Sequence, residues 1–428
     1  MSDAATHRAI DAIYRIESPK LIAALTRVVR DVGLAEELAQ DALVTALERW
    51  PQTGVPDNPG AWLMATAKHR AIDRVRRTKL VDRKHEQIGH ELASRRDLTV
   101  EQIEAAVDDD VGDDLLRLVF TCCHPVLSSE ARVALTLRLL GGLTTDEIAR
   151  AFLVPEPTIA QRIVRAKRTL ADKQVPFEVP RGPELAERLA SVLACIYLVF
   201  NEGYSATAGD DWMRPGLCED ALRLGRILAE LAPNEPEVHG LVALMEIQAS
   251  RTRARVGPTG EPILLLEQNR ALWDQLLIRR GFAALARAEA VGGARGPYVL
   301  QAAIAACHAR AVTADQTDWT RIAGLYDELA VIVPSPVVEL NRGVAVSMAF
   351  GPAAGLEIVD QLIDEPSLAG YHLLPSVRGD LLIKLGRLAE ARGELERAAA
   401  LTRNVREREL LLARAETCVA TPRQSRDN

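Results

Sequence analysis

Apolar residues between positions 143 and 170 recur at intervals of three and four, the spacing that lines one face of an α-helix. Thr144 and Glu147 form a capping box, which predicts the start of a first short helix. The buried face of that helix is predicted to hold Leu143, Ile148 and Ala149. The stretch 151–154 is then expected to make the turn to a second helix.

The second predicted helix starts near Pro157, where the missing N–H of proline costs nothing. Its inward positions are apolar: Ile159, Ile163, Ala166 and Leu170. Its outward positions are polar or basic: Thr158, Gln161, Arg162, Arg165 and Arg168. Because arginine recognises guanine edges, glutamine recognises adenine and cations bind phosphate, the pair predicts a helix-turn-helix that reads DNA. The alternative is an amphipathic helix pair with a solvated basic face.

A second basic segment is predicted upstream. The pattern predicts an acidic helix over 34–50, a loop around Pro59 and Gly60, and a basic helix over 62–77. Between positions 62 and 84 two acids, Asp73 and Asp82, stand against eight basic residues: Lys68, Arg70, Arg74, Arg76, Arg77, Lys79, Arg83 and Lys84. The whole chain has a formal charge of −7, so its affinity for DNA must come from confined cationic patches and must weaken with salt.

The order of these elements resembles the extracytoplasmic-function (ECF) sigma factors of bacterial RNA polymerase. The resemblance covers roughly residues 8–173 and rests on the acidic helix, the run RAIDRVRR at 70–77 and the helix-turn-helix. It implies an all-α fold with a sigma region-two domain over 1–85, which binds core polymerase and recognises and melts the −10 element. An acidic linker over 86–112 and a region-four domain over 113–175, which recognises the −35 element, are expected to follow.

Residue roles follow from the resemblance position by position. The −35 contacts fall on Thr158, Gln161, Arg162, Arg165 and Arg168. The core polymerase contacts fall on Glu37, Gln40, Asp41 and Val44 of the acidic helix. That helix is expected to turn Glu36, Glu37, Gln40, Asp41, Val44 and Glu48 outward, and Leu34, Leu38, Ala42, Leu43, Ala46, Leu47 and Trp50 inward.

The −10 contacts fall on Lys68, His69, Arg70, Arg74, Arg76 and Arg77. Residues 67–70 match the short loop that captures an extruded base in the family. Many members have Asn where this chain has His69, and the two side chains offer a base different donors and acceptors, so the −10 sequence preference does not carry over. The simpler interpretation is that His69 is an ordinary surface residue.

Between the two basic segments, residues 86–114 carry ten acidic residues and two basic ones. Such a block repels itself and resists packing, which favours a solvated linker. In sigma factors the equivalent linker threads through the polymerase, and a polyanionic peptide suits a cation-lined channel.

Composition indicates a multidomain protein of the cytoplasm. The chain has 428 residues and 48% apolar content, enough for more than one core. The N-terminus lacks an apolar signal, and the apolar run 189–200 is too short to span a bilayer, so no membrane partner is expected. The six cysteines have no spacing typical of disulfides or zinc, and Cys122 and Cys123 are expected to be buried at a helix end. No metal and no cofactor are expected.

The C-terminal half, 176–428, follows a Pro-rich connector at 175–183 and is predicted to be helical throughout, without convincing strands. The small and apolar positions of a tetratricopeptide-like (TPR-like) helix pair are held by Gly379, Gly386, Ala391, Leu395 and Ala398. Weaker echoes of such a pair span 221–245, around Pro233, and 322–348, around Pro334. Some ECF sigma factors carry an extension of this kind, which implies that it regulates the sigma module through contacts within the chain.

Two further stretches, 200–205 (FNEGYS) and 209–212 (GDDW), combine glycine turns with acids and aromatic rings. They are either a ligand or partner site or simply helix-capping loops packed by their rings.

The sequence therefore predicts a non-enzymatic sigma factor whose partners are core RNA polymerase and promoter DNA. The alternative is a TPR-like scaffold or adaptor with a DNA-binding helix-turn-helix but no sigma activity; a hydrolase around His239 and Asp211 lacks a catalytic residue set.

Overall fold

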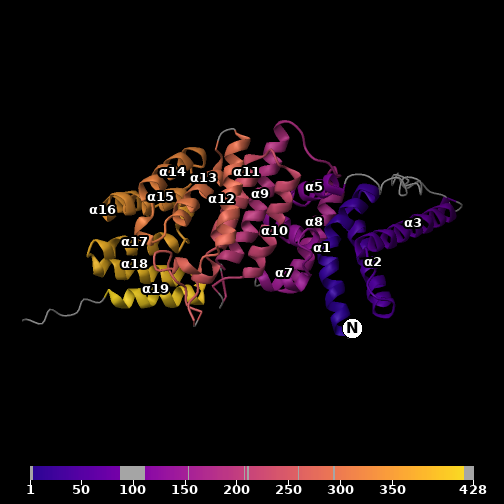
Figure 1. Ribbon diagram of the computed structural model, residues 1–428, viewed down its shortest axis with the longest axis horizontal. Helices are drawn as coiled ribbons and strands as arrows, with labels where there is room; N and C mark the ends of the chain where they lie inside the picture. The colour runs from indigo at the N-terminus through magenta and orange to yellow at the C-terminus, as the bar shows by residue number, and fades with distance from the viewer. Residues whose placement is uncertain are drawn as a thin grey trace, which may run out of the picture. The chain divides into compact units, whose positions relative to one another are not determined.

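The computed structural model describes residues 3–86, 111–152, 154–206, 208–209, 212–258, 260–292 and 295–418. The chain divides into two compact units, Met1–Leu198 and Val199–Asn428. The described residues are predominantly helical, which confirms the all-α prediction (Figure 1). No helix in the described ranges is both long enough and apolar enough to cross a membrane.

The first unit begins with three long helices, α1 (Asp3–Val29), α2 (Val32–Thr53) and α3 (Pro59–Glu86). Each of the three packs against the other two. Asp31 caps α2 by accepting a hydrogen bond from the N–H of Leu34. Trp50 is almost fully buried and meets Trp62 edge to face, with ring centroids 5.2 Å apart. These contacts fix the angle at which the loop between α2 and α3 turns the chain.

Four helices follow the predicted acidic linker: α5 (Val111–Cys122), α6 (Ser129–Leu139), α7 (Thr145–Phe152) and α8 (Glu156–Asp172). Helix α5 packs on α1, where Arg27 Nε lies 3.0 Å from the buried carboxylate of Asp114. Residues 87–110 of the predicted linker at 86–112 lie outside the described residues, whereas its ends belong to α3 and α5.

Helix α9 (Pro183–Tyr204) begins where the predicted Pro-rich connector ends, and the boundary between the units falls inside it. Its first half packs on the four-helix group of the first unit. Arg188 donates to the carbonyl of Phe120 (3.0 Å), and the hydroxyl of Ser191 donates to the carbonyl of Cys123 (2.6 Å). The first unit therefore extends beyond the helix-turn-helix into α9.

The second unit is a chain of helices in which neighbours in sequence are neighbours in space (Figure 1). Its α-helices after α9 are α10 (Pro215–Leu231), α11 (Pro236–Ala249), α12 (Gln275–Val291), α13 (Pro297–Arg310), α14 (Trp319–Ile332), α15 (Pro336–Phe350), α16 (Pro352–Asp360), α17 (Leu373–Lys384), α18 (Leu388–Leu401) and α19 (Val405–Thr417). Short 3₁₀ turns are η1 (Thr252–Ala254), η2 (Arg270–Leu272), η3 (Ala314–Gln316) and η4 (Pro366–Leu368). The predicted helix pairs around Pro233 and Pro334 are confirmed as α10 with α11 and α14 with α15.

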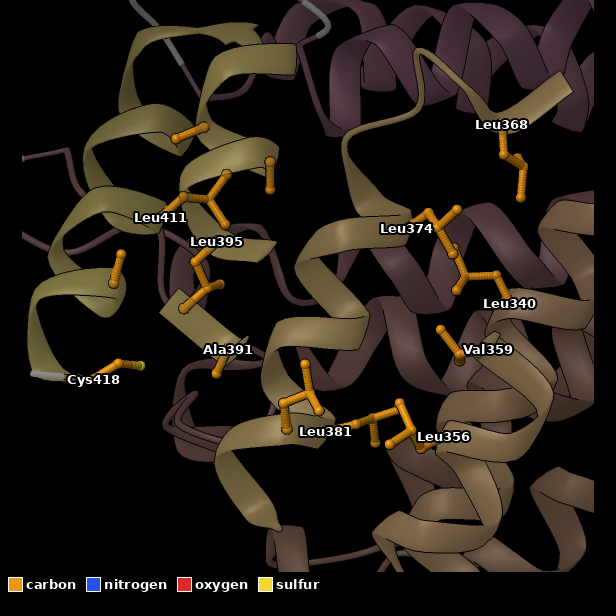
Figure 2. Close-up of a cluster of buried hydrophobic side chains, with 14 residues drawn as sticks. Leu340, Leu356, Val359, Leu368, Leu374, Leu381, Ala391, Leu395, Leu411 and Cys418 are labelled. Atoms are coloured by element: carbon orange, nitrogen blue, oxygen red, sulfur yellow. The ribbon is translucent and has the colours of Figure 1, made fainter. Parts of the chain in front are cut away.

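Helices α17 and α18 form the TPR-like pair predicted from the sequence. Gly379 on α17 faces α18 so closely that an added Cβ would lie 3.0 Å from the side chain of Leu395. Gly386 turns the chain between the helices with φ +75°, a conformation that other residues rarely adopt. Figure 2 shows Leu381, Ala391 and Leu395 in the buried cluster that continues to Leu411 of α19. Small side chains here allow the helices to approach closely.

One feature of the second unit was not predicted. Two-residue strands β1 (Ala208–Gly209) and β2 (Arg403–Asn404) pair in parallel. The side-chain amide of Asn404 also donates to the carbonyl of Ala206 (3.1 Å). The pairing thus joins segments nearly two hundred residues apart, near the two ends of the second unit. No local pattern in so short a strand could have indicated it.

Candidate nucleic-acid interface

Helix α8 presents the predicted recognition face. Its fully buried residues are Ile159, Ile163, Ala166 and Leu170, which confirms the predicted inward face. Gln161, Arg165 and Arg168 are exposed, and Thr158 and Arg162 are partly exposed. Among the described residues Arg168 pairs with Asp172 on the next turn (3.4 Å), and both of these side chains are largely exposed. A ligand could replace so exposed a pair at little cost.

The capping box that positions α7 is present as predicted. The Thr144 hydroxyl accepts from the N–H of Glu147 (3.1 Å), and the Glu147 carboxylate accepts from the N–H of Thr144 (2.7 Å). Leu143, Ile148 and Ala149 are buried, also as predicted. The expected turn at 151–154 is wrong in its first half, because α7 continues through Phe152. Ala151 and Phe152 contain no feature that ends a helix, and Pro155 is the first residue that does.

Helix α3 carries the predicted −10 residues. His69 and Arg70 are exposed and Lys68 is partly exposed, whereas Leu63, Ala67 and Ala71 are buried. Arg74, Arg76 and Arg77 lie on the same helix, but their side chains lie outside the described part. Residues 67–70 are helical, as the predicted helix over 62–77 requires, so the backbone here does not form the loop of the family segment that they match. The segment has neither Gly nor Pro, and its Ala67 lies one turn from Ala71 on the buried face.

Helix α2 carries the predicted polymerase-binding residues. Glu37, Asp41 and Val44 are exposed, Val44 by 52%. Gln40 is partly exposed and donates to the carboxylate of Glu36 (2.8 Å). Of the residues expected to face inward, Leu38, Ala42, Ala46 and Trp50 are buried, whereas Leu34, Leu43 and Leu47 are only partly so.

The expectation that Glu36 faces outward is wrong, because only 3% of the residue is exposed. Its carboxylate lies 2.6 Å from the guanidinium of Arg138 on α6 and also pairs with the ammonium of Lys167 on α8. The helix expected to bind polymerase and the helix expected to bind DNA therefore share a buried acid. The available signal was spacing: Glu36 lies four residues from Val32 and three from Ala39, on the buried stripe of α2.

The cysteines and His239 are structural. Cys122 and Cys123 are buried at the end of α5, as predicted, and burial is the main cause that raises the pKa of the Cys122 thiol. Nε2 of His239 donates to the carbonyl of Pro233 (2.9 Å), as a helix-connecting contact. Asp211, its suggested hydrolase partner, lies outside the described residues.

The 200–205 stretch ends α9 in a closely packed turn. Phe200 is fully buried and stacks on Tyr204, and Glu202 forms an ion pair with Arg214. A Cβ at Gly203 would lie 2.6 Å from the backbone nitrogen of Cys218, so only glycine fits. The packing interpretation of this stretch accounts for these contacts. It does not account for the guanidinium of Arg255, which lies over the ring of Tyr204.

Comparison with known proteins supports both halves of the first unit. Residues 13–81 match the family model of sigma-70 region 2, and residues 117–170 match that of sigma-70 region 4. Residues 188–289 match a family of unknown function, DUF6596. No solved structure matches the chain.

Among individual relatives, an uncharacterised protein of Rhizobium meliloti (strain 1021) is 43% identical over 414 residues, 96% of each chain. An ECF RNA polymerase sigma factor, SigK, of Mycobacterium sp. (strain KMS) is 30% identical over 159 residues, 36% of this chain and 77% of the relative. The SigK protein of Mycobacterium tuberculosis (strain ATCC 25177 / H37Ra) is 30% identical over 148 residues, 34% of this chain and 74% of the relative.

Proposed function

The chain belongs to the extracytoplasmic-function RNA polymerase sigma factors, and we propose that it binds core RNA polymerase and directs it to promoters with −35 and −10 elements. The observation that carries this proposal is the division of α8 into a buried apolar face and an accessible face with Gln161, Arg165 and Arg168. A capped helix precedes it, so the accessible face is held in a defined orientation. Guanidinium and amide groups so placed suit base edges and phosphates in a major groove.

The −10 element is assigned to the accessible face of α3. Lys68, His69 and Arg70 of this face lie between the buried residues Ala67 and Ala71. Melting a promoter requires no covalent chemistry. Unstacking a base costs a few kcal/mol, and a site that holds the extruded base, with cations on the opened backbone, offsets that cost. Arg74, Arg76 and Arg77 continue the basic sequence of this helix and are the candidate backbone contacts.

Core polymerase is assigned to the exposed side of α2, where Glu37, Asp41 and Val44 stand one turn apart and Gln40 lies between them. Two carboxylates beside an exposed apolar side chain suit a basic partner helix with an apolar patch. Glu36 is not part of this surface, because Arg138 and Lys167 already occupy its carboxylate.

The test is run-off transcription with purified core polymerase and the full chain. The double substitution Arg162→Ala with Arg165→Ala should lower promoter-specific transcripts by at least tenfold, because each lost base or phosphate contact costs about 1–3 kcal/mol. The matched control is Arg279→Ala with Arg280→Ala, two exposed arginines on α12, which should transcribe like the parent protein. Unchanged promoter selection by the first variant would disprove the recognition-helix assignment. Failure of the parent chain to join core polymerase in a pull-down would favour the scaffold alternative.

The second unit is proposed to modulate this activity. It adds a self-contained helical array with its own core to a sigma module that other ECF sigma factors carry in shorter chains. TPR-like arrays present extended surfaces to partners, so a signal received there could alter polymerase or promoter binding.

A further inference from the structure

Three arginines gather in the second unit beside the end of α11, of which Arg255 is buried and Arg251 and Arg270 are partly exposed. Arg251 follows α11, Arg255 follows η1 and Arg270 opens η2. We refer to Arg251, Arg255 and Arg270 as the arginine cluster. All three lie within the region that matches the family of unknown function.

Aromatic rings hold the cluster together. The Cζ of Arg255 lies 3.5 Å from the centroid of the Tyr204 ring, and the Cζ of Arg251 lies 5.7 Å from the same centroid. Arg251 and Arg270 likewise share Trp273, at 5.8 and 4.9 Å. Each pair of neighbouring guanidinium groups therefore rests on one ring, and Arg251 belongs to both pairs. Cation–π contacts of this kind offset part of the cost of bringing like charges together.

Among the described residues no carboxylate forms an ion pair with the arginine cluster, and the one acid that raises the pKa of Arg270 is the fully exposed Asp315. Elsewhere in the described residues, arginines with mostly buried side chains face acids: Arg27 faces Asp114, Arg188 faces Glu184, and Arg378 faces Asp360 and Glu394. Arg270 donates instead to the carbonyls of His308 (2.6 Å) and Ala311 (2.7 Å) and to the hydroxyl of Thr317 (3.0 Å).

Several polar atoms of the cluster and its surroundings are buried without a hydrogen-bond partner among the described residues. They are the Nε atoms of Arg251, Arg255 and Arg270, Nε1 of Trp273, Nδ1 of His308 and Oε1 of Gln268. Arg255 is only 8% exposed. A buried cation with an unused donor is costly, and buried polar groups in native proteins almost always have a partner. Four N–H donors on cationic or indole side chains in one neighbourhood indicate a missing acceptor.

The electrostatics agree with a missing anion. Burial lowers the pKa of the Arg255 guanidinium, and Arg251 lowers it further by repulsion. The pKa of His308 is lowered to about 4, first by burial and then by Arg251 and Arg270. An anion bound among these groups would reverse the repulsive contribution in every case.

We propose that the arginine cluster binds a phosphoryl group of a small ligand or of a modified partner. Guanidinium groups match phosphate oxygens in a planar, two-pronged geometry, and a dianion balances several neighbouring cations better than a single carboxylate does. Tyr204 from the FNEGY stretch forms the floor beneath two of the three cations. If the FNEGY stretch is part of a ligand site, the proposal gives the chemical class of its ligand, a phosphoryl compound.

The test is isothermal titration of the full chain with inorganic phosphate at pH 7.5 and constant ionic strength. Saturable binding is expected for the parent protein. Arg255→Gln should weaken it at least tenfold, and Arg255→Lys should weaken it less, because the charge remains while the planar fork is lost. The matched control is Arg253→Gln, which removes the same charge from an exposed neighbour on η1 and should change the dissociation constant less than twofold.

Citrate in place of phosphate distinguishes the two anion classes, and phosphate must bind more tightly. A parent chain without saturable phosphate binding would overturn the proposal, whether or not the Arg255 variants fold. Phosphate would fail to bind if the cluster were paired with Asp210 or Asp211, which lie outside the described residues. Equal weakening by Arg255→Gln and Arg253→Gln would also overturn it, since binding would then follow net charge alone. The titration involves no polymerase, so its outcome is separate from that of the transcription experiment.

Discussion

Glu36 is a single acidic residue through which α2 contacts both α6 and α8. Its carboxylate is almost fully buried and serves Arg138 and Lys167 at once, while Gln40 donates a third interaction. Burying a charge is favourable only with such partners, and removing one member leaves the others uncompensated.

Glu36→Ala is therefore expected to lower the free energy of unfolding of the first unit by about 3 kcal/mol, the cost of breaking a buried ion pair. Urea denaturation followed by circular dichroism measures this change. An exposed glutamate on the same helix provides the control: Glu48→Ala should shift the free energy by no more than about 0.5 kcal/mol. Equal effects of the two substitutions would show that the junction contributes nothing to stability.

His308 predicts a pH dependence of stability. Its pKa is about 4 in the folded chain, against an ordinary value of 6.5, because burial and then Arg251 and Arg270 disfavour the charged form. The unfolded chain binds a proton as the pH falls below 6.5, whereas the folded chain does not until about 4. The stability contributed by neutral His308 is therefore present above pH 6.5 and is lost as the pH falls from 6.5 to 4, by roughly 2.5 kcal/mol at pH 4.5.

Melting temperatures at pH 7 and pH 4.5 check this expectation. The variant His308→Gln should show a smaller difference between the two pH values than the parent chain does. His69→Gln, at an exposed position on α3, should retain the parent difference. An unaltered pH dependence in His308→Gln would mean that His308 is not the responsible group.

At the scale of elements, α7 and α8 show what local sequence specifies well. The capping box, the proline at the start of α8 and the buried stripe of Ile159 and Ile163 all appear as predicted, because each depends on residues within one or two turns. The end of α7 was predicted less well, since propensity near a helix end is weak and Pro155 acts only three residues later.

Thr144→Ala removes one side of the capping box and should destabilise the start of α7 by about 1 kcal/mol. Hydrogen exchange of the amides at 145–147 should quicken correspondingly. Thr145→Ala, at the first residue of α7, retains the cap and should not accelerate exchange, because alanine favours the helix. Faster exchange in both variants alike would contradict a specific role for the Thr144 hydroxyl.

At the scale of the molecule, α9 determines where a working sigma module can be cut. Arg188, Ser191 and Cys195 attach its first half to α5 and α6: Arg188 and Ser191 bind the carbonyls of Phe120 and Cys123, and the Cys195 thiol lies 3.5 Å from the Thr136 hydroxyl. A cut in the Pro-rich connector removes all three, whereas a cut at Leu198 retains them.

Residues 1–180 should therefore melt several degrees below residues 1–198, since each kcal/mol lost from a domain of this size costs roughly 2–4 °C. Residues 1–198 are also the appropriate comparison with the full chain in run-off transcription. A difference in promoter-specific transcripts is expected if the second unit modulates activity. Equal transcription by both proteins would refute that modulation, and equal melting of the two truncations would refute the role of α9.

The sequence alone determined the helical class, the order of the sigma segments, the capping box of α7 and the inward faces of α8 and of the α17–α18 pair. These features depend on periodicity and on neighbours along the chain. Only the tertiary structure decided that Glu36 is buried against Arg138 and Lys167, that β1 pairs with β2, and that three arginines share two aromatic rings. The reason is physical: the cost of burying a charge, and the partner that offsets it, depend on residues brought together by folding from distant parts of the chain.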